Sequence, residues 1–129
     1  MLKIYIADLT HNYVIVSNET MPLGVAYIKA YLKKYLGDKV DCKLFRYPDV
    51  LIKCIKKETP DVLMLSNYVW NEALGYFIIS QAKKHNPSIC TIMGGPNFHL
   101  DREKQEEYLR RHFNLDFYIL GEGEVPSVN

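Results

Sequence analysis

The strongest structural signal in this sequence is Pro60-Asp61-Val62-Leu63-Met64-Leu65-Ser66-Asn67. A Pro-Asp pair typical of turns precedes residues 62–66, which stay apolar until the polar end at Ser66. A strand with one exposed face alternates apolar and polar residues, whereas a strand covered on both faces is apolar throughout. This segment therefore predicts a strand buried inside a parallel sheet.

On either side of this strand, short apolar runs alternate with longer segments of helical period, as βαβ units require. Thr20 is the expected N-cap of a first helix with Pro22 in its first turn, and Gly37 is its expected stop. A polar loop over residues 10–21 precedes this helix. The expected strands are 3–9, 39–46, 62–66, 89–93 and 117–120, and the expected helices are 20–36, 48–58, 70–85 and 101–113. The apolar stripe expected on the first helix is Leu23, Ala26, Tyr27, Ala30 and Tyr31.

Successive β-α steps with right-handed crossovers predict an α/β, Rossmann-like fold, in which helices cover both faces of a five-stranded parallel sheet in three layers, αβα. Residues 39–46 alternate more than the other strands, which places them at a sheet edge. This edge position favours the flavodoxin-like strand order 2-1-3-4-5. Only Val125–Asn129 follow the fifth strand and its loop Gly121-Glu122-Gly123-Glu124, so we expect a truncated last helix. We also expect one domain over residues 1–129 that is part of a longer polypeptide.

Composition and charge argue against several classes of partner. The formal net charge is +1 and the lysines and arginines form no basic face, which argues against nucleic acid. No apolar run approaches the length of a membrane span or a signal peptide. Cys42, Cys54 and Cys90 lack the C-x-x-C spacing of a zinc or redox site, and free thiols are typical of a reducing compartment. We therefore expect a soluble, cytoplasmic protein.

Ligands of an open parallel sheet bind beyond the carboxyl ends of its strands. The loops expected at that edge are polar and rich in glycine. Glycine lets a ligand approach the backbone where a Cβ would collide, although Gly94-Gly95 can also be a simple tight turn. The loops are Thr10-His11-Asn12, Ser66-Asn67-Tyr68, Gly94-Gly95-Pro96-Asn97 and Gly121-Glu122-Gly123-Glu124.

Several families with this architecture are excluded because the sequence lacks their characteristic motifs. A dinucleotide-binding unit needs G-x-G-x-x-G after the first strand, where this chain has Ala7-Asp8-Leu9-Thr10-His11-Asn12. A P-loop needs a G-K-[ST] triplet, which the sequence lacks. A receiver domain needs an aspartate at the end of the third strand, which here ends Leu65-Ser66-Asn67. A flavodoxin needs a hydroxyl- and glycine-rich phosphate loop after the first strand, and that loop is also missing.

Four motifs in register resemble the cobalamin-binding N-terminal domain of cobalamin-dependent radical SAM proteins. They cover nearly all of the chain and fall on the expected elements in the expected order. The first is similar to that family's P-L-G-L-A-Y-L-A-A-Y-L segment, and the last two match its G-G-P and G-E-G-E signatures. The motifs are Pro22-Leu23-Gly24-Val25-Ala26-Tyr27 with Ala30-Tyr31-Leu32, Pro60-Asp61-Val62 with Ser66 and Trp70-Asn71, Gly94-Gly95-Pro96, and Gly121-Glu122-Gly123-Glu124.

The resemblance implies a domain that holds cobalamin in its base-off form. The corrin would lie over the carboxyl edge of the sheet, and the nucleotide tail would enter a groove in the domain. Small residues at the strand ends would admit that tail. The expected cofactor-binding residues are Thr10, His11, Ser66, Asn67, Tyr68, Gly94, Gly95, Pro96, Gly121, Glu122 and Gly123.

Several of these residues also have a structural interpretation. His11 is a candidate cobalt ligand, but its spacing from Asp8 departs from the D-x-H-x-x-G of methionine-synthase-type domains, and solvent exposure is the alternative. Ser66 can hydrogen-bond the tail or cap the third helix. Glu122 and Glu124 can accept hydrogen bonds from a ligand or be first-turn acids of a helix. The aromatic residues that can stack on the corrin or simply pack are Tyr68, Trp70 and Phe98.

The sequence lacks the C-x-x-x-C-x-x-C motif that holds a radical SAM cluster. The resemblance then implies no catalytic residue in this chain, and an iron–sulfur cluster and S-adenosylmethionine in a radical SAM catalytic domain beyond residue 129. The whole would be a methyltransferase or an enzyme of the anaerobic magnesium-protoporphyrin ester cyclase type. The alternatives are the same fold without cofactor, as an interaction or substrate-recognition domain, and a small-molecule enzyme using His11 with Asp8.

Overall fold

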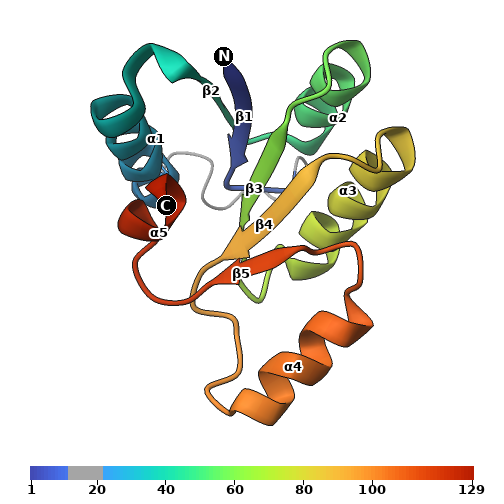
Figure 1. Cartoon of the computed structure of the whole chain (residues 1–129). Helices are drawn as coiled ribbons and strands as arrows, with labels where there is room; N and C mark the ends of the chain where they lie inside the picture. Colours follow the sequence, from blue (N-terminus) through green and yellow to red (C-terminus); the bar gives the residue numbers. More distant parts are fainter. Residues whose placement is uncertain (12–21) are drawn as a thin grey trace.

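The computed structural model describes residues 1–11 and 22–129, and it contains a five-stranded parallel sheet with the order β2-β1-β3-β4-β5 (Figure 1). The predicted fold class and strand order are therefore confirmed. The strands are β1 (Leu2–Ala7), β2 (Val40–Phe45), β3 (Val62–Ser66), β4 (Cys90–Gly94) and β5 (Phe117–Ile119). The helices are α1 (Leu23–Leu36), α2 (Pro48–Lys57), α3 (Glu72–His85), α4 (Arg102–Arg111) and α5 (Glu124–Val128), with a 3-10 turn η1 (Gly37–Lys39).

Two hydrophobic cores lie on the two faces of the sheet, because successive strand residues point to opposite sides. On β1, Ile4 and Ile6 face α1, whereas Tyr5 and Ala7 belong to the core beneath α2 and α3. Figure 1 shows α1 and α5 on one side of the sheet and α2 and α3 on the other. This arrangement gives the three expected layers.

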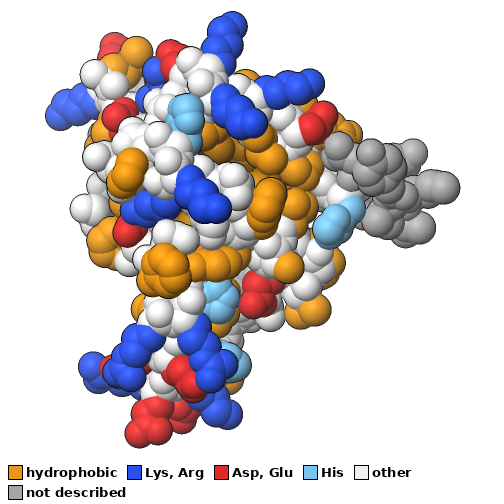
Figure 2. All heavy atoms as spheres, turned by 90° about the vertical axis from the view of Figure 1, so that its right-hand side faces the viewer, with side chains coloured by type: hydrophobic (Ala, Val, Ile, Leu, Met, Phe, Trp, Pro, Cys, Tyr) orange, Lys and Arg blue, Asp and Glu red, His pale blue; other side chains and the backbone are white. Residues whose placement is uncertain are grey.

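Helix α4 stands apart from these layers at one end of the molecule (Figure 1). Tyr108 is its buried residue, and the Tyr108 ring packs edge-on against Phe98 and stacks on His112. Figure 2 shows the rest of α4 as a projection crowded with basic and acidic side chains. The side chain of Asp101 caps this helix by accepting a hydrogen bond from the backbone N–H of Lys104.

Element ends differ from the sequence prediction by a few residues. The first strand ends at Ala7 rather than at residue 9, and the third helix begins at Glu72 rather than at residue 70. Gly37 does end α1, with φ of 53° and its N–H donated to the carbonyl of Lys33. The predicted cap at Thr20 lies outside the described residues. The predicted last helix is present as the short α5.

The predicted apolar stripe of α1 is wrong. Val25 and Leu32 are buried against the sheet together with the partly buried Ile28, whereas Leu23 and Tyr27 are more than half exposed. Both sets recur with helical period, so periodicity alone cannot choose between them. The aliphatic set fills the core, because a tyrosine can keep its hydroxyl in water.

In the described part of the chain, no helix is both long and apolar enough to span a membrane.

Candidate functional site

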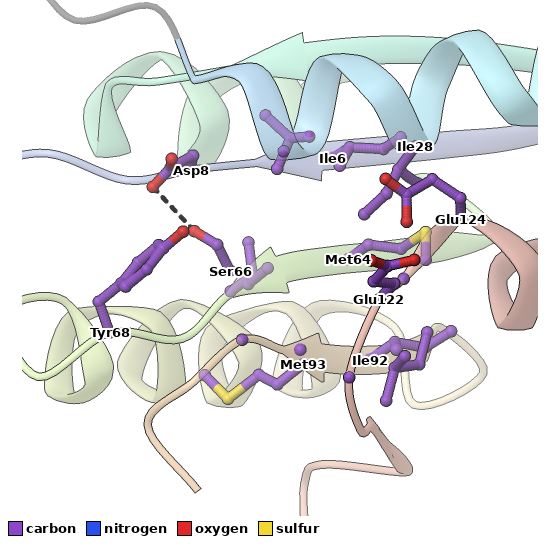
Figure 3. A pocket seen from close by; sticks show the side chains of 18 residues that line it. Ile6, Asp8, Ile28, Met64, Ser66, Tyr68, Ile92, Met93, Glu122 and Glu124 are labelled. Carbon is purple, nitrogen blue, oxygen red and sulfur yellow. Dashed lines mark hydrogen bonds between the residues drawn. The ribbon is translucent and has the colours of Figure 1, made fainter.

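A groove of about 220 Å³ opens between α1 and the sheet, at the carboxyl ends of the strands (Figure 3). It is bounded by β1, β3, β4 and β5, by the first turns of α1, and by the turn that leads into α5. The lining residues are Ile6, Asp8, Gly24, Val25, Ile28, Met64, Leu65, Ser66, Tyr68, Ile92, Met93, Gly94, Gly95, Ile119, Gly121, Glu122, Gly123 and Glu124.

The floor of the groove is apolar. Ile6, Met64 and Ile92 come from three adjacent strands and point toward α1, from which Val25 and Ile28 meet them. Gly24 leaves the mouth open on the helix side, because a Cβ added there meets no atom within 4 Å. The groove therefore suits a flat or apolar part of a ligand.

One side of the rim is held by a hydrogen bond between two strands. The hydroxyl of Ser66, at the end of β3, donates to a carboxylate oxygen of Asp8 at 2.8 Å (Figure 3). The backbone N–H of Asp8 is itself donated to the carbonyl of Phe45 on β2. Ser66 does not cap α3, whose N-cap is Asn71. Its hydroxyl instead positions an acid at the mouth of the groove.

Gly95 brings two rim loops closer than any other residue would allow. Its φ is +129°, and a Cβ added there would lie 2.6 Å from the carbonyl oxygen of Asn67. The N–H of Asn67 is donated to the carbonyl of Gly94 at 2.6 Å. This close backbone approach, and not only a tight turn, explains a glycine at position 95.

Asn67 is fully buried, and it ties the rim together instead of lining the groove. Its side-chain amide donates to the carbonyl of Asn97 at 2.9 Å and to the hydroxyl of Tyr118 at 3.2 Å. The Tyr118 hydroxyl donates in turn to the carbonyl of Gly95 at 2.8 Å. Burial raises the pKa of Tyr118, so this hydroxyl stays protonated as a donor at neutral pH.

The structure brings together most of the residues expected from the sequence and separates the rest. The expected residues that line the groove are Ser66, Tyr68, Gly94, Gly95, Gly121, Glu122 and Gly123. Those that do not line it are Thr10, His11, Asn67 and Pro96. The Nε2 atom of His11 lies 2.9 Å from the carbonyl oxygen of Trp70, and this contact attaches the exposed imidazole ring of His11 to the rim of the groove. Within residues 1–11 and 22–129, no group of His, Cys, Asp and Glu side chains is arranged to hold a metal ion.

Sequence reasoning missed the floor of the groove and one of its walls. Ile6, Met64 and Ile92 carry no signal, because an apolar strand residue looks the same whether it lines a groove or a solid core. Gly24 and Ile28 do fall within or beside the first motif, so that motif contained the only available indication of this wall.

The three aromatic residues near the rim separate into two groups. Tyr68 and Trp70 stack with ring centroids 4.5 Å apart and planes 5° apart, and Trp70 remains 63% exposed. Phe98 stacks on Tyr118 with centroids 3.7 Å apart, away from the groove lining. Phe98 therefore packs, whereas Tyr68 and Trp70 present an open aromatic surface at the rim.

The charged residues of the groove are all acids. Asp8, Glu122 and Glu124 line it, and Figure 3 shows the side chains of Glu122 and Glu124 beside Met64 and Ile28. In the part of the chain that the structure describes, no lysine, arginine or histidine lines the groove.

Solved structures with the same fold include proteins of different kinds. A cobalamin-binding protein from Desulfitobacterium hafniense matches 98% of this chain and 55% of its own, with a TM-score of 0.66 and 12% identity. NtrX from Brucella abortus, in complex with ADP, matches 99% of this chain and 25% of its own, with a TM-score of 0.66 and 15% identity. At such identities these likenesses show the fold alone.

Two curated proteins match part of the sequence. A 2-(S-pantetheinyl)-carbapenam-3-carboxylate methyltransferase from Streptantibioticus cattleyicolor is 34% identical over 66 residues, which are 51% of this chain. The cobalamin-dependent radical SAM methyltransferase TokK from Streptomyces tokunonensis is 33% identical over 66 residues. The chain spans only 9% of the length of each.

The family model described as "B12 binding domain" matches residues 14–129, which include every strand after the first and the whole turn from Gly121 to Glu124. The family predicted from the four motifs is thereby confirmed. The chain belongs to the B12 binding domain family.

Proposed function

We propose that this chain is the cobalamin-binding module of a radical SAM enzyme, most simply a methyltransferase. The observation that carries the proposal is the groove, which is open at the carboxyl rim, apolar at its floor and built on the motifs of the family. Two methyltransferases among the partial relatives, one of them a cobalamin-dependent radical SAM enzyme, support the enzyme class. The anaerobic magnesium-protoporphyrin ester cyclase type is the other subtype compatible with the resemblance.

The size of the groove supports a ligand that is only partly enclosed. Sites that enclose a whole drug-sized ligand measure about 300–1,000 Å³, and this groove is smaller, at about 220 Å³. It would take one arm of a large cofactor while the remainder stays outside. A corrinoid with a nucleotide tail has that shape.

The residues present fit such a cofactor. The floor of Ile6, Met64 and Ile92 would cover the flat base of the tail, and Ser66 would meet the tail where it enters. Tyr68 and Trp70 would contact the edge or face of the corrin outside the groove. When bound, cobalamin supplies the cobalt chemistry of group transfer, and this chain holds and orients it. His11 remains a proposed cobalt ligand without further support.

The catalytic part would lie outside this chain. The sequence has no C-x-x-x-C-x-x-C, so the iron–sulfur cluster and S-adenosylmethionine would belong to a radical SAM domain that continues the single domain of residues 1–129. We propose that this larger protein works in the cytoplasm.

The alternative function, an interaction domain that has lost its cofactor, predicts a groove filled by the chain's own side chains. Phe98 is instead packed on Tyr118, and Tyr68 lies at the rim. These positions favour a cofactor site over an interaction domain.

The test mixes the purified chain with hydroxocobalamin, removes free ligand by desalting, and measures corrin absorbance that elutes with the protein. The matched pair of variants is Gly24→Leu, which places a side chain at the open mouth, and Ala30→Leu, an exposed position of α1 outside the groove lining. We expect the wild type and Ala30→Leu to retain corrin and Gly24→Leu to lose it. Absence of retained corrin in the wild type would overturn the proposal.

A further inference from the structure

Three residues of the groove floor lie in one row across the sheet. Ile6 on β1 is the register partner of Met64 on β3, and Met64 is the register partner of Ile92 on β4. Because residues in register on neighbouring strands point to the same face of a sheet, all three side chains meet the groove (Figure 3). A flat group that lies along this row contacts hydrocarbon and one thioether, which is at most a weak hydrogen-bond acceptor.

The floor offers a ligand no hydrogen-bond donor. Its three residues lie on central strands, whose backbone groups pair with a neighbouring strand on each side. The hydroxyl of Ser66 is already donated to Asp8, and the carboxylates of Glu122 and Glu124 accept hydrogen bonds but donate none. Among the described residues that line the groove, the remaining side-chain donor is the hydroxyl of Tyr68, beside Ser66 at the rim (Figure 3).

Cobamides differ in the base that ends the nucleotide tail, which is a benzimidazole in cobalamin and can be a purine such as adenine in related cofactors. We propose that the floor of Ile6, Met64 and Ile92 selects cobamides with an apolar base over those with a purine. The inference rests on the proposed function and adds to it the class of cofactor that the same groove takes. The three floor residues are specificity-determining residues and take no part in catalysis.

The physical basis is the polarity of the base and not its shape, because both bases are flat, fused rings. The adenine of a cobamide carries three free ring nitrogens and an amine, whereas the base of cobalamin carries one free ring nitrogen and two methyl groups. Glu122 or Glu124 can accept the amine of adenine, but nothing on the floor donates to its ring nitrogens. Burying an acceptor without a donor weakens binding, whereas methyl groups on an apolar floor strengthen it.

The test measures a preference, defined as the affinity for methylcobalamin divided by the affinity for its adenine counterpart. Equilibrium dialysis in the dark, read by corrin absorbance, gives both affinities. The two free cofactors also differ in how readily the base leaves the cobalt, so preferences are compared between variants, where that difference cancels. The matched pair is Ile92→Thr and Ile92→Val at a partly buried position, because the two new side chains have the same shape and differ by a hydroxyl in place of a methyl group.

Ile92→Val should keep the wild-type preference, whatever its effect on the overall affinity. The hydroxyl introduced by Ile92→Thr can donate to a ring nitrogen of adenine and should lower the preference by roughly two- to tenfold. Met64→Gln and Met64→Leu form a second pair, in which the introduced amide should lower the preference and the leucine change should keep it. Circular dichroism shows which variants fold.

Equal preferences within every pair that folds overturn the selection of an apolar base. If neither donor variant folds, the wild type decides with the p-cresol counterpart, whose base cannot bind cobalt. That cofactor should bind more tightly than the adenine counterpart, and equal or weaker binding overturns the inference. In each of these cases bound methylcobalamin leaves the proposed function standing, whereas a wild type that binds none of the cofactors overturns the proposed function and the inference together.

Discussion

The hydroxyl of Ser66 lies 2.8 Å from a carboxylate oxygen of Asp8, and this hydrogen bond joins the ends of β3 and β1 at the mouth of the groove. A partly buried hydrogen bond to a charged group contributes about 1.5–3 kcal/mol, more than a bond between neutral groups. The bond also fixes the direction of an acid that faces an entering ligand.

Ser66→Ala should lower the free energy of unfolding by about 1–3 kcal/mol, because the carboxylate of Asp8 loses its donor in a partly buried site. Urea unfolding followed by circular dichroism measures the change. Asp8→Asn serves as the partner variant, since its amide oxygen can still accept from Ser66. A Ser66→Ala midpoint equal to that of the wild type would contradict the importance of this bond.

Gly95→Ala should destabilise the chain by about 2–3 kcal/mol or more, because its φ of +129° is strained for alanine and its Cβ would lie 2.6 Å from the carbonyl of Asn67. Gly24→Ala is the matched control, because its Cβ meets nothing within 4 Å. Thermal unfolding should therefore separate the two alanine variants clearly. Equal melting temperatures would show that the rim can relax at no cost.

Asp116 should make stability depend on pH in the acid range. Burial raises the pKa of its carboxyl, but hydrogen bonds from Lys83 at 2.7 Å and Thr91 at 2.8 Å outweigh burial, and the pKa lies below its ordinary value. A carboxylate with a lowered pKa stabilises the fold above its unfolded pKa of about 4 and loses this contribution as the pH falls through the folded value.

Asp116→Asn should accordingly be less stable than the wild type at pH 7 and lose less stability on acidification. Urea midpoints at a series of pH values measure both effects. The matched control is Asp38→Asn at an exposed position, measured over the same series of pH values. Parallel profiles for the wild type and Asp116→Asn would refute the assignment.

Trp70→Ala should weaken cobalamin retention by roughly two- to tenfold, because it removes the exposed member of the aromatic pair with Tyr68. Trp70→Phe keeps a flat apolar ring and should recover most of the affinity. The ratio of corrin to protein after desalting gives the comparison. Equal retention by all three proteins would place the corrin elsewhere on the rim.

The sequence predicted the sheet well because its signals are local. Residues 62–66 are apolar on both faces and end at a polar residue, and the structure gives β3 those same bounds. The orientation of α1 was not predictable, since Leu23 and Tyr27 form as regular a stripe as Val25 and Ile28. What distinguishes the two stripes is which of them meets the sheet, and this depends on packing that no single helix encodes.

The candidate site was predictable at its rim and hidden at its floor. Gly95 and Gly121 follow the ends of β4 and β5, where a glycine is visible in the sequence, and the structure gives both a positive φ. Asn67 is a polar residue directly after a strand, which is where a binding residue is expected. Its side-chain amide, however, is hydrogen-bonded to Asn97 and Tyr118. Only the three-dimensional structure distinguishes a polar side chain that faces a ligand from one that hydrogen-bonds to neighbouring residues.

Because α4 is attached through Tyr108, its only buried residue, we expect this helix to open locally more easily than the sheet. A helix held by one buried residue, Tyr108, and the partly buried Leu109 can detach while β4 and the rest of the sheet stay intact, so its amide protons should exchange with solvent well before those of β1 and β3. The connection between β4 and β5 is for the same reason the place where this domain can accept inserted sequence or a changed helix without disturbing the groove.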